Sequence, residues 1–229
     1  MVKQSDFMKA KHNQVQERRI ESKIKNPKRI NMRRQQIIKG AIEVFTSKGF
    51  HNSTTKEIAM AAGVTEGTLY NYVRSKEDII YIVYDYITQI LRNDMEKAIA
   101  GVKDPEERLK AALVQNLKTI DEYQDIIMFV YKESNSLDKE SLYAVLARET
   151  GYIEMFEELL TEYFKGKKVD PTKIKLSADL LCYIPVIVTF RRWSLKRRFT
   201  SMDAVMPGIL DFILHGIEFV TEFSDKKLD

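Results

Sequence analysis

The chain has 229 residues, of which 44% are hydrophobic and 31% charged, with one Cys, five Pro and nine Gly. This composition is typical of a soluble globular protein and excludes a disordered, collagen-like or disulfide-stapled chain. The longest uncharged run near the hydrophobic maximum, residues 180–190, is too short to cross a bilayer, and the N-terminus lacks a secretory apolar core. We therefore expect no membrane association and a cytoplasmic protein.

Positive charge is concentrated near the N-terminus. The first 80 residues hold 16 Lys and Arg against 8 Asp and Glu, whereas the rest of the chain has a net charge of −4. Such an uneven distribution favours a polyanionic partner. Residues 1–32 alone carry nine Lys and Arg beside three acids, and we interpret them as a basic N-terminal arm. Two interpretations of the arm stay open, solvated leader sequence and contact with nucleic acid.

From Met32 onward, apolar residues recur at helical spacing, and no stretch alternates long enough to form a strand. We predict an all-α fold of about nine helices. Thr55 and Thr65 are available as N-caps, and Ser75 is placed to cap the helix that follows it. The expected helices are 33–48, 55–62, 66–72, 76–100, 105–121, 123–133, 138–165, 171–198 and 202–223.

The most specific pattern lies in residues 37–76. An apolar stripe that includes Ile38 and Phe45 marks one helix, and a second stripe that includes Ile58 marks a shorter one. Gly63 then supplies the backbone freedom that a tight turn between helices requires, and Thr65 can cap the next helix. This order predicts a helix-turn-helix.

The third helix of this motif is about 10 Å long at 1.5 Å per residue, so it can lie in a DNA major groove. Leu69 and Val73 should face inward. Gly67 allows close backbone approach, and Lys76 can address a phosphate. The outward surface is expected to hold residues that can bond base edges or phosphates, namely Thr65, Glu66, Thr68, Tyr70, Asn71 and Tyr72.

In these residues the chain resembles the DNA-binding domain of TetR/AcrR-family transcriptional regulators. The resemblance covers roughly residues 36–82 and rests on Ile38, Ala41, Phe45, Gly49-Phe50, Thr54-Thr55, Ile58-Ala59, Ala62-Gly63-Val64-Thr65, Gly67-Thr68-Leu69-Tyr70, Tyr72 and Ser75-Lys76-Glu77. It implies DNA contacts by Thr55, Thr65, Glu66, Gly67, Thr68, Tyr70, Asn71, Tyr72 and Lys76. Two residues depart from the family pattern: Glu66, where a basic or small polar residue is common, and Val73, where Phe is usual.

The resemblance also implies three parts: the arm 1–32, a DNA-binding domain 33–78, and a ligand-binding and dimerisation domain 79–229. Two segments of the last part, residues 126–131 and 180–190, are apolar all round and must be covered by the core, a ligand or another subunit. Core packing is one interpretation of their aromatic and Met residues. The other is an effector pocket for a mostly apolar molecule, lined by Met128, Phe129, Tyr131, Tyr152, Met155, Phe156, Tyr183, Phe190 and Trp193.

The last two expected helices, 171–198 and 202–223, carry more apolar surface than one chain of this size can cover. In the family, these two helices of each subunit form a four-helix interface, so the resemblance implies a homodimer that reads a palindromic double-stranded DNA operator. Gly216 is small enough for close helix approach, and Pro185 should bend the longer helix.

A basic cluster formed by Arg191, Arg192, Lys196, Arg197 and Arg198 ends the longer helix. One interpretation is favourable placement at the negative helix terminus. The other is contact with the phosphates of an effector such as an acyl-CoA, a ligand to which some members of the family respond.

No catalytic residues, metal ligands or cofactor site are expected. His12, His51 and His215 are scattered along the chain, none pairs with Cys182, and no glycine-rich phosphate loop is present. The sequence therefore predicts a ligand-responsive transcriptional repressor. The alternatives are an effector-independent architectural DNA-binding protein and a transcriptional activator.

Overall fold

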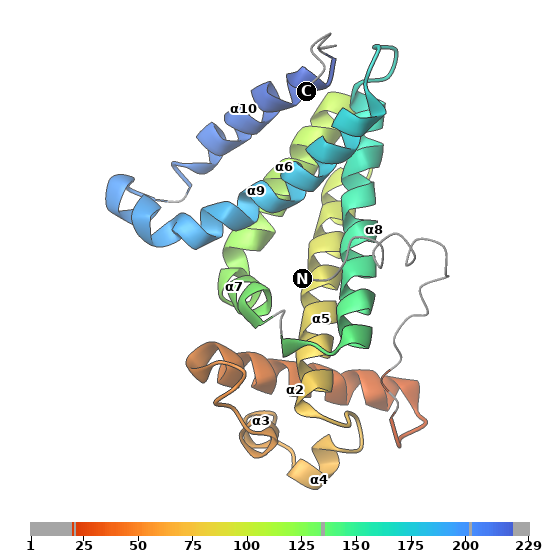
Figure 1. Cartoon of the computed structure of the whole chain (residues 1–229), viewed down its shortest axis with the longest axis vertical. Coiled ribbons are helices and arrows are strands. Elements are labelled where there is room, and N and C mark those ends of the chain that lie inside the picture. The colour runs from red at the N-terminus through yellow and green to blue at the C-terminus, as the bar shows by residue number, and fades with distance from the viewer. Residues whose placement is uncertain (1–19, 21, 134–135, 202, 222–229) are drawn as a thin grey trace. The chain divides into compact units, whose positions relative to one another are not determined.

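The computed structural model describes residues 20, 22–133, 136–201 and 203–221 (Figure 1). Within these ranges every regular element is helical, which confirms the all-α prediction. The helices are α2 (Pro27–Lys48), α3 (Thr55–Ala61), α4 (Glu66–Leu69), α5 (Lys76–Ile99), α6 (Pro105–Glu122), α7 (Gln124–Glu133), α8 (Lys139–Tyr163), α9 (Pro171–Arg198), α10 (Met206–Gly216) and the 3-10 helix η2 (Ile217–Thr221). Most of the arm 1–32 lies outside the described residues.

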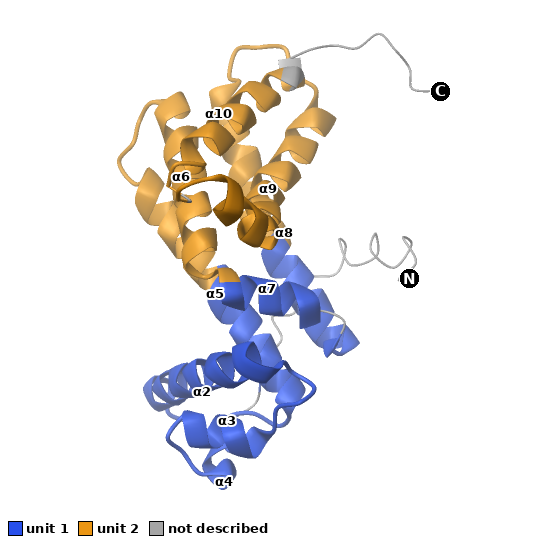
Figure 2. Ribbon diagram, turned by 90° about the vertical axis from the view of Figure 1, so that its left-hand side faces the viewer, with its two compact units in different colours: residues 1–88, 125–149 blue, residues 89–124, 150–229 orange. Residues whose placement is uncertain are grey.

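The chain forms two compact units (Figure 2). Unit 1 contains the chain up to Thr88 together with Asp125–Glu149, and unit 2 contains Gln89–Gln124 and the chain from Thr150. Helices α5 and α8 each contribute one part to each unit. This division differs from a cut between residues 78 and 79, because α7 and the first part of α8 group with the N-terminal helices. The predicted domain boundaries stay predictions.

Helix α2 starts at Pro27, six residues before the expected start, so the predicted boundary of the basic arm cuts into a helix. The side chain of Asn26 accepts a hydrogen bond from the backbone N–H of Arg29, at 3.2 Å, and Pro27 occupies the first turn. This pair is a strong start signal because Asn caps the free N–H groups and Pro has none to satisfy.

Glycine at position 40 allows α2 to approach α3 closely. A methyl group there would lie 2.6 Å from the backbone nitrogen of Ala62, at the end of α3. The buried face of α2 around this point includes Ile37, Ala41 and Phe45. Because backbone cannot yield as a flexible side chain can, only glycine fits at this crossing.

The turn between α3 and α4 matches the prediction, whereas the cap of α3 is shifted by one residue. Gly63 has φ +66°, in the left-handed region that glycine tolerates. Thr65 accepts a hydrogen bond from the backbone N–H of Thr68 at 3.1 Å and caps α4. Helix α3 is capped by Thr54 rather than Thr55, and Glu57 completes a capping box with Thr54.

Helix α7 packs on α2 and α5 within unit 1. The ring of Phe129 stacks on that of Phe45, with centroids 4.9 Å apart and an interplanar angle of 13°. The hydroxyl of Tyr84, on α5, donates to the carbonyl of Val130. Unit 1 therefore has a continuous core that joins α2, α5 and α7.

Unit 2 is a helical bundle around an apolar core from α5, α6, α8, α9, α10 and η2. Its most buried members include Met95, Leu109, Leu113, Phe156 and Leu160. One polar contact crosses this core at Pro185, which lies inside α9 and has no N–H for the carbonyl of Leu181. That carbonyl instead accepts a hydrogen bond from Nδ2 of Asn116, on α6, at 3.2 Å.

The C-terminal helix is shorter than the predicted 202–223. Helix α10 spans Met206–Gly216 and continues as the 3-10 helix η2. Pro207 suits only a first turn, and Gly216 is a weak helix former, so both limit the α-helical stretch. In the described ranges no helix combines the length and the apolar composition that crossing a bilayer requires.

Candidate nucleic-acid interface and effector site

Helix α4 presents a polar face to solvent. Leu69 is fully buried and holds the helix on unit 1, as predicted, whereas Thr65 and Gly67 are exposed. Tyr70 is 40% exposed, and a methyl group at Gly67 would meet nothing within 4 Å. Another molecule can therefore approach the backbone of α4 closely at this point.

A hydrogen-bonded group joins the start of α3 to α4. The hydroxyl of Thr55 donates to Oε1 of Glu66 at 2.6 Å and lies 3.2 Å from the hydroxyl of Tyr70. The carboxylate of Glu66 is therefore partly satisfied inside the protein. This arrangement orients Tyr70 and explains how an acidic residue is accommodated on this face.

Tyr72 and Lys76 lie differently from the sequence expectation. Tyr72 is only 2% exposed, so its predicted place on the outward surface is wrong: its side chain packs into the core of unit 1. The ammonium group of Lys76 donates to the carbonyls of Phe50 and Ser53 at 2.8 and 3.0 Å and lies 4.3 Å from the centre of the Phe50 ring. It stabilises the α2–α3 loop and retains one further N–H.

The DNA contacts of all nine predicted residues stay predictions. Seven of the nine lie on or beside the solvent-facing side of α3 and α4: Thr55, Thr65, Glu66, Gly67, Thr68, Tyr70 and Asn71. Gly40 and Arg34 were not among the residues predicted to matter. A glycine inside an amphipathic helix could have indicated the role of Gly40.

Arg34 holds the beginning of the described chain against unit 1. Its Nη2 donates to the carbonyls of Ile20 and Tyr72, at 2.5 and 3.3 Å. Burial lowers the pKa of this guanidinium, while the nearby charges of Asp78 and Asp85 oppose the shift.

The nine predicted effector residues are divided between the two units. Met128, Phe129 and Tyr131 belong to α7 in unit 1, and the other six belong to unit 2. Within unit 2, Tyr152 and Phe156 are buried, whereas Phe190 is 43% and Trp193 66% exposed. Their roles in effector binding stay predictions.

Tyr152 and Phe156 fill the core of unit 2. Their ring centroids are 5.7 Å apart in an edge-on arrangement. The hydroxyl of Tyr152 donates to Oδ1 of Asn116 at 2.9 Å, which extends the polar contact at Pro185. Burial raises the pKa of the Tyr152 hydroxyl well above its ordinary value, and the nearby Cys182 and Asp94 act in the same direction.

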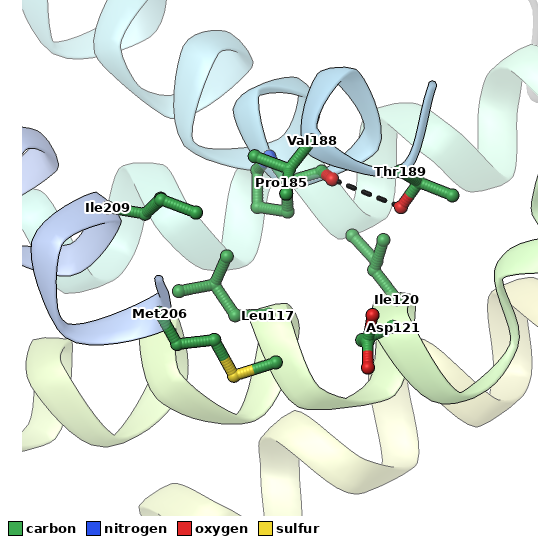
Figure 3. A pocket seen from close by; sticks show the side chains of 8 residues that line it. All are labelled: Leu117, Ile120, Asp121, Pro185, Val188, Thr189, Met206 and Ile209. Atoms are coloured by element: carbon green, nitrogen blue, oxygen red, sulfur yellow. Dashed lines mark hydrogen bonds between the residues drawn. The ribbon is translucent and has the colours of Figure 1, made fainter. Parts of the chain in front are cut away.

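A small pocket lies between α6, α9 and α10 (Figure 3). The space inside it is only about 10 Å³, room for about one water molecule and far below the range of roughly 300–1,000 Å³ usual for ligand sites. None of the nine predicted effector residues lines it. The lining is mainly apolar and consists of Leu117, Ile120, Asp121, Pro185, Val188, Thr189, Met206 and Ile209.

The rim of this pocket carries an ion pair between Asp121, on α6, and Arg192, on α9. Arg192 belongs to the basic cluster at the end of α9, and Arg191, Lys196, Arg197 and Arg198 are all exposed. These basic side chains place positive charge next to the apolar pocket, where it can bind an anionic group of a ligand.

The outer face of α9 is apolar. Leu176, Leu180, Ile187 and Phe190 are 50%, 45%, 59% and 43% exposed. They follow one another at intervals of four, seven and three residues, so they share one stripe of the helix. Phe212 on α10 is 73% exposed. A methyl group at Gly216 would meet nothing within 4 Å.

Two family models match the chain. Residues 37–81 match "Bacterial regulatory proteins, tetR family", and residues 102–216 match "Tetracyclin repressor-like, C-terminal domain". The chain belongs to the TetR family. It is therefore a transcription regulator with a helix-turn-helix and no enzymatic activity, as the sequence predicted.

Similar proteins agree with this assignment. The transcriptional regulator HbdR of Aromatoleum sp. (strain CIB) is 27% identical over 197 residues, which are 83% of each chain. The structure of FadR from Bacillus subtilis in complex with stearoyl-CoA has a TM-score of 0.66 and 22% identity, and covers 80% of this chain and 98% of that one. The structure of AibR with isovaleryl coenzyme A and operator DNA has a TM-score of 0.60 and 18% identity, with coverage of 82% and 98%.

No group of three or more His, Cys, Asp and Glu residues that could hold a metal ion occurs in the part of the chain that the structure describes. Three carboxylates recur at intervals of four residues along α8, namely Glu154, Glu158 and Glu162. Glu162 forms an ion pair with Arg108, on α6, at 2.6 Å, whereas Glu154 and Glu158 are exposed.

Proposed function

We propose that this TetR-family regulator is a cytoplasmic, ligand-responsive repressor that binds a palindromic operator as a homodimer. The observation that carries the proposal is the exposed apolar stripe on α9, formed by Leu176, Leu180, Ile187 and Phe190. A large contiguous apolar surface of this kind is a characteristic of subunit interfaces. A second copy related by a twofold axis covers it, and the two helix-turn-helix motifs then read two identical half-sites.

Operator recognition in this proposal is divided between base edges and phosphates. Thr68 and Asn71 bond base edges, and the hydroxyl of Tyr70 bonds a phosphate oxygen. Thr55 and Glu66 hold Tyr70 in place through the contacts described above. Thr65 and Gly67 allow the backbone of α4 to approach the groove.

The effector in this proposal is a mostly apolar small molecule, with an acyl-CoA as the class to test first. Two observations support the choice: the apolar pocket between α6, α9 and α10 opens beside the Asp121–Arg192 pair, and exposed basic residues follow it on α9. FadR and AibR, similar in fold, are described as complexes with acyl-CoA molecules.

The present pocket is too small for a long acyl chain, so binding requires that α9 or α10 moves. An effector releases the operator only if it binds the low-affinity state more tightly than the DNA-bound state. Pro185, which interrupts the backbone hydrogen bonds of α9 and forms part of the pocket wall, gives α9 a point at which this change can start.

Native mass spectrometry of the full chain purified from its host tests both parts of the proposal. We expect the mass of a dimer, with or without a retained small molecule. An operator is then selected from random duplexes, and acyl-CoA molecules of several lengths are titrated into the complex. A monomer at micromolar concentration, or failure to select any DNA, overturns the proposal.

Variants in and just after α4 test which residues contact bases and which contact phosphates. Thr68→Ala and Asn71→Ala should each change the preferred base at one position of the operator, with a cost of about 1–3 kcal/mol on the original sequence. Tyr70→Phe should weaken binding to all sequences alike. Unchanged binding by all three variants contradicts the predicted contacts.

One observation favours a second candidate function, an effector-independent DNA-binding protein of architectural type. Tyr152 and Phe156 fill the core of unit 2, and the pocket beside α9 is small. If no acyl-CoA or retained molecule changes operator affinity, this alternative replaces the ligand-responsive one. A reporter gene behind the operator separates repression from activation by the sign of its response.

A further inference from the structure

The segment before α2 is held against the end of the predicted DNA-reading helix. The backbone N–H of Lys23 and the hydroxyl of Ser22 both donate to the carbonyl of Asn71, at 3.0 and 2.9 Å. Ile20 is buried, at 6% exposure, and its carbonyl accepts a hydrogen bond from Arg34. Contacts on both sides therefore fix the path of this segment next to Asn71.

The side chains of the segment alternate between half-buried and exposed. Ser22 and Ile24 are half-buried, and the hydroxyl of Ser22 also accepts the N–H of Ile24 at 3.1 Å. Lys23 and Lys25 are exposed. The contacts of Ser22 and of the Lys23 backbone therefore hold the segment on unit 1 and leave both lysine side chains in solvent.

Further positive charge follows in the first turn of α2. Lys28 and Arg29 are exposed, and no acidic residue occurs between Ser22 and Ile42. Cations at a helix N-terminus are unfavourable because they oppose the helix dipole. These two charges therefore do not stabilise α2. Residues that go against a local structural preference are typical of functional positions.

We propose that Lys23 and Lys25, supported by Lys28 and Arg29, bind operator phosphates that flank the bases read by α4. The inference rests on the proposed DNA binding and adds a second contact surface to it. Lys23 is hydrogen-bonded through its backbone to Asn71, so its side chain starts next to a residue that is expected to contact bases. Duplex DNA carries one negative charge per roughly 1.7 Å of axis, so phosphates lie on either side of the bases read.

The test compares Lys23→Ala/Lys25→Ala with the wild type by fluorescence anisotropy, on the operator that the wild type selects. The affinity should fall, and the slope of log K against log salt concentration should become shallower by about 0.9 for each phosphate contact removed. The selected base sequence should not change. The melting temperature should also stay the same, because both side chains are exposed.

A matched control removes the same charge elsewhere. Lys165→Ala/Lys175→Ala neutralises two exposed lysines of unit 2 and should leave the salt slope unchanged. Ile20→Ala keeps every charge but loosens the segment, and should weaken binding by less than the double lysine variant. Lys28→Ala/Arg29→Ala should raise the melting temperature and still weaken DNA binding, a combination that a purely structural role does not produce.

The outcomes separate this inference from the proposed function. If the wild type binds its operator and Lys23→Ala/Lys25→Ala shows the affinity and salt slope of the control, the inference is overturned and the proposed function stands. If the wild type selects no DNA under any salt condition, the proposed function itself fails, and the phosphate contacts fail with it.

Discussion

Two exposed surfaces of this protein differ in what solvent exposure costs them. The face of α4 displays Thr65, Gly67 and Tyr70, which are small or polar, and Thr65 already caps its own helix. The face of α9 displays Leu180 and Ile187, whose burial away from water would lower the free energy. Solvent exposure costs the first surface little, so it suits a transient partner. The second surface favours a permanent partner that keeps it buried. The variants below change either the stripe of α9 or the elements that position α4.

The largest effect is expected from charge on the stripe of α9. Leu180→Glu/Ile187→Glu should convert a dimer to monomers, because two carboxylates per subunit cannot be buried unpaired. Operator affinity should then fall by about 100-fold or more, since two linked half-site contacts become independent. Analytical ultracentrifugation and anisotropy measure the two effects. Asn93→Glu/Thr161→Glu adds the same charge at exposed sites of α5 and α8 and should remain dimeric.

A smaller effect, on stability, is expected from Gly40→Ala. The added methyl group meets the backbone of Ala62 at 2.6 Å, and overpacking of this kind costs about 1–3 kcal/mol in the free energy of unfolding. Urea unfolding followed by circular dichroism measures it. Gly151→Ala is the matched control, because its methyl group meets only the end of Arg92, at 3.6 Å, and should be neutral or stabilising. Equal stability of the two variants would show that the α2–α3 crossing is not tight.

The next prediction separates Lys76 from the DNA contacts of α4. Lys76→Met keeps the apolar stem but removes the donor to the carbonyl of Ser53 and one of the donors to the carbonyl of Phe50, so we expect a loss of about 1–3 kcal/mol in stability. Tyr70→Phe should weaken DNA binding without this loss. If Lys76→Met unfolds like the wild type and only its salt slope for DNA binding changes, the ammonium serves phosphate instead of the loop.

The smallest effect concerns the capping box of α3. Thr54→Ala should cost about 1 kcal/mol, as the loss of an N-cap usually does. Hydrogen bonds from Lys48 and Thr54 lower the pKa of the exposed Glu57 from 4.5 to about 2. Because the folded-state pKa is the lower one, the contribution of Glu57 is complete above pH 4.5 and is lost as the pH falls toward 2.

Glu57→Gln tests the same capping box by its pH dependence. Its melting temperature should lie below that of the wild type at pH 6, and the difference should shrink between pH 4.5 and 2 in thermal unfolding scans. A difference that is constant over this range contradicts the assigned contacts. Lys110 is a useful comparison, because the pKa of its ammonium is raised by Glu106 rather than lowered.

Much of the DNA-binding part could be predicted because its signals are local. A cap, a left-handed glycine and an apolar residue at helical spacing act within a few residues, as Thr65, Gly63 and Leu69 show. The effector site could not be predicted in the same way. Tyr152 and Trp193 look alike in a sequence, and only packing between helices buries one and exposes the other.

The sequence by itself determined the helical class, the turn between α3 and α4 and the family to which the chain belongs, because short-range backbone and capping preferences encode them. Only the tertiary structure decided that Tyr72 turns inward, that Lys76 serves a loop and that Lys23 lies beside Asn71. Each of these depends on contacts between residues that are far apart in the chain or on opposite sides of a turn. Such contacts are set by how whole helices pack, and no local pattern records them.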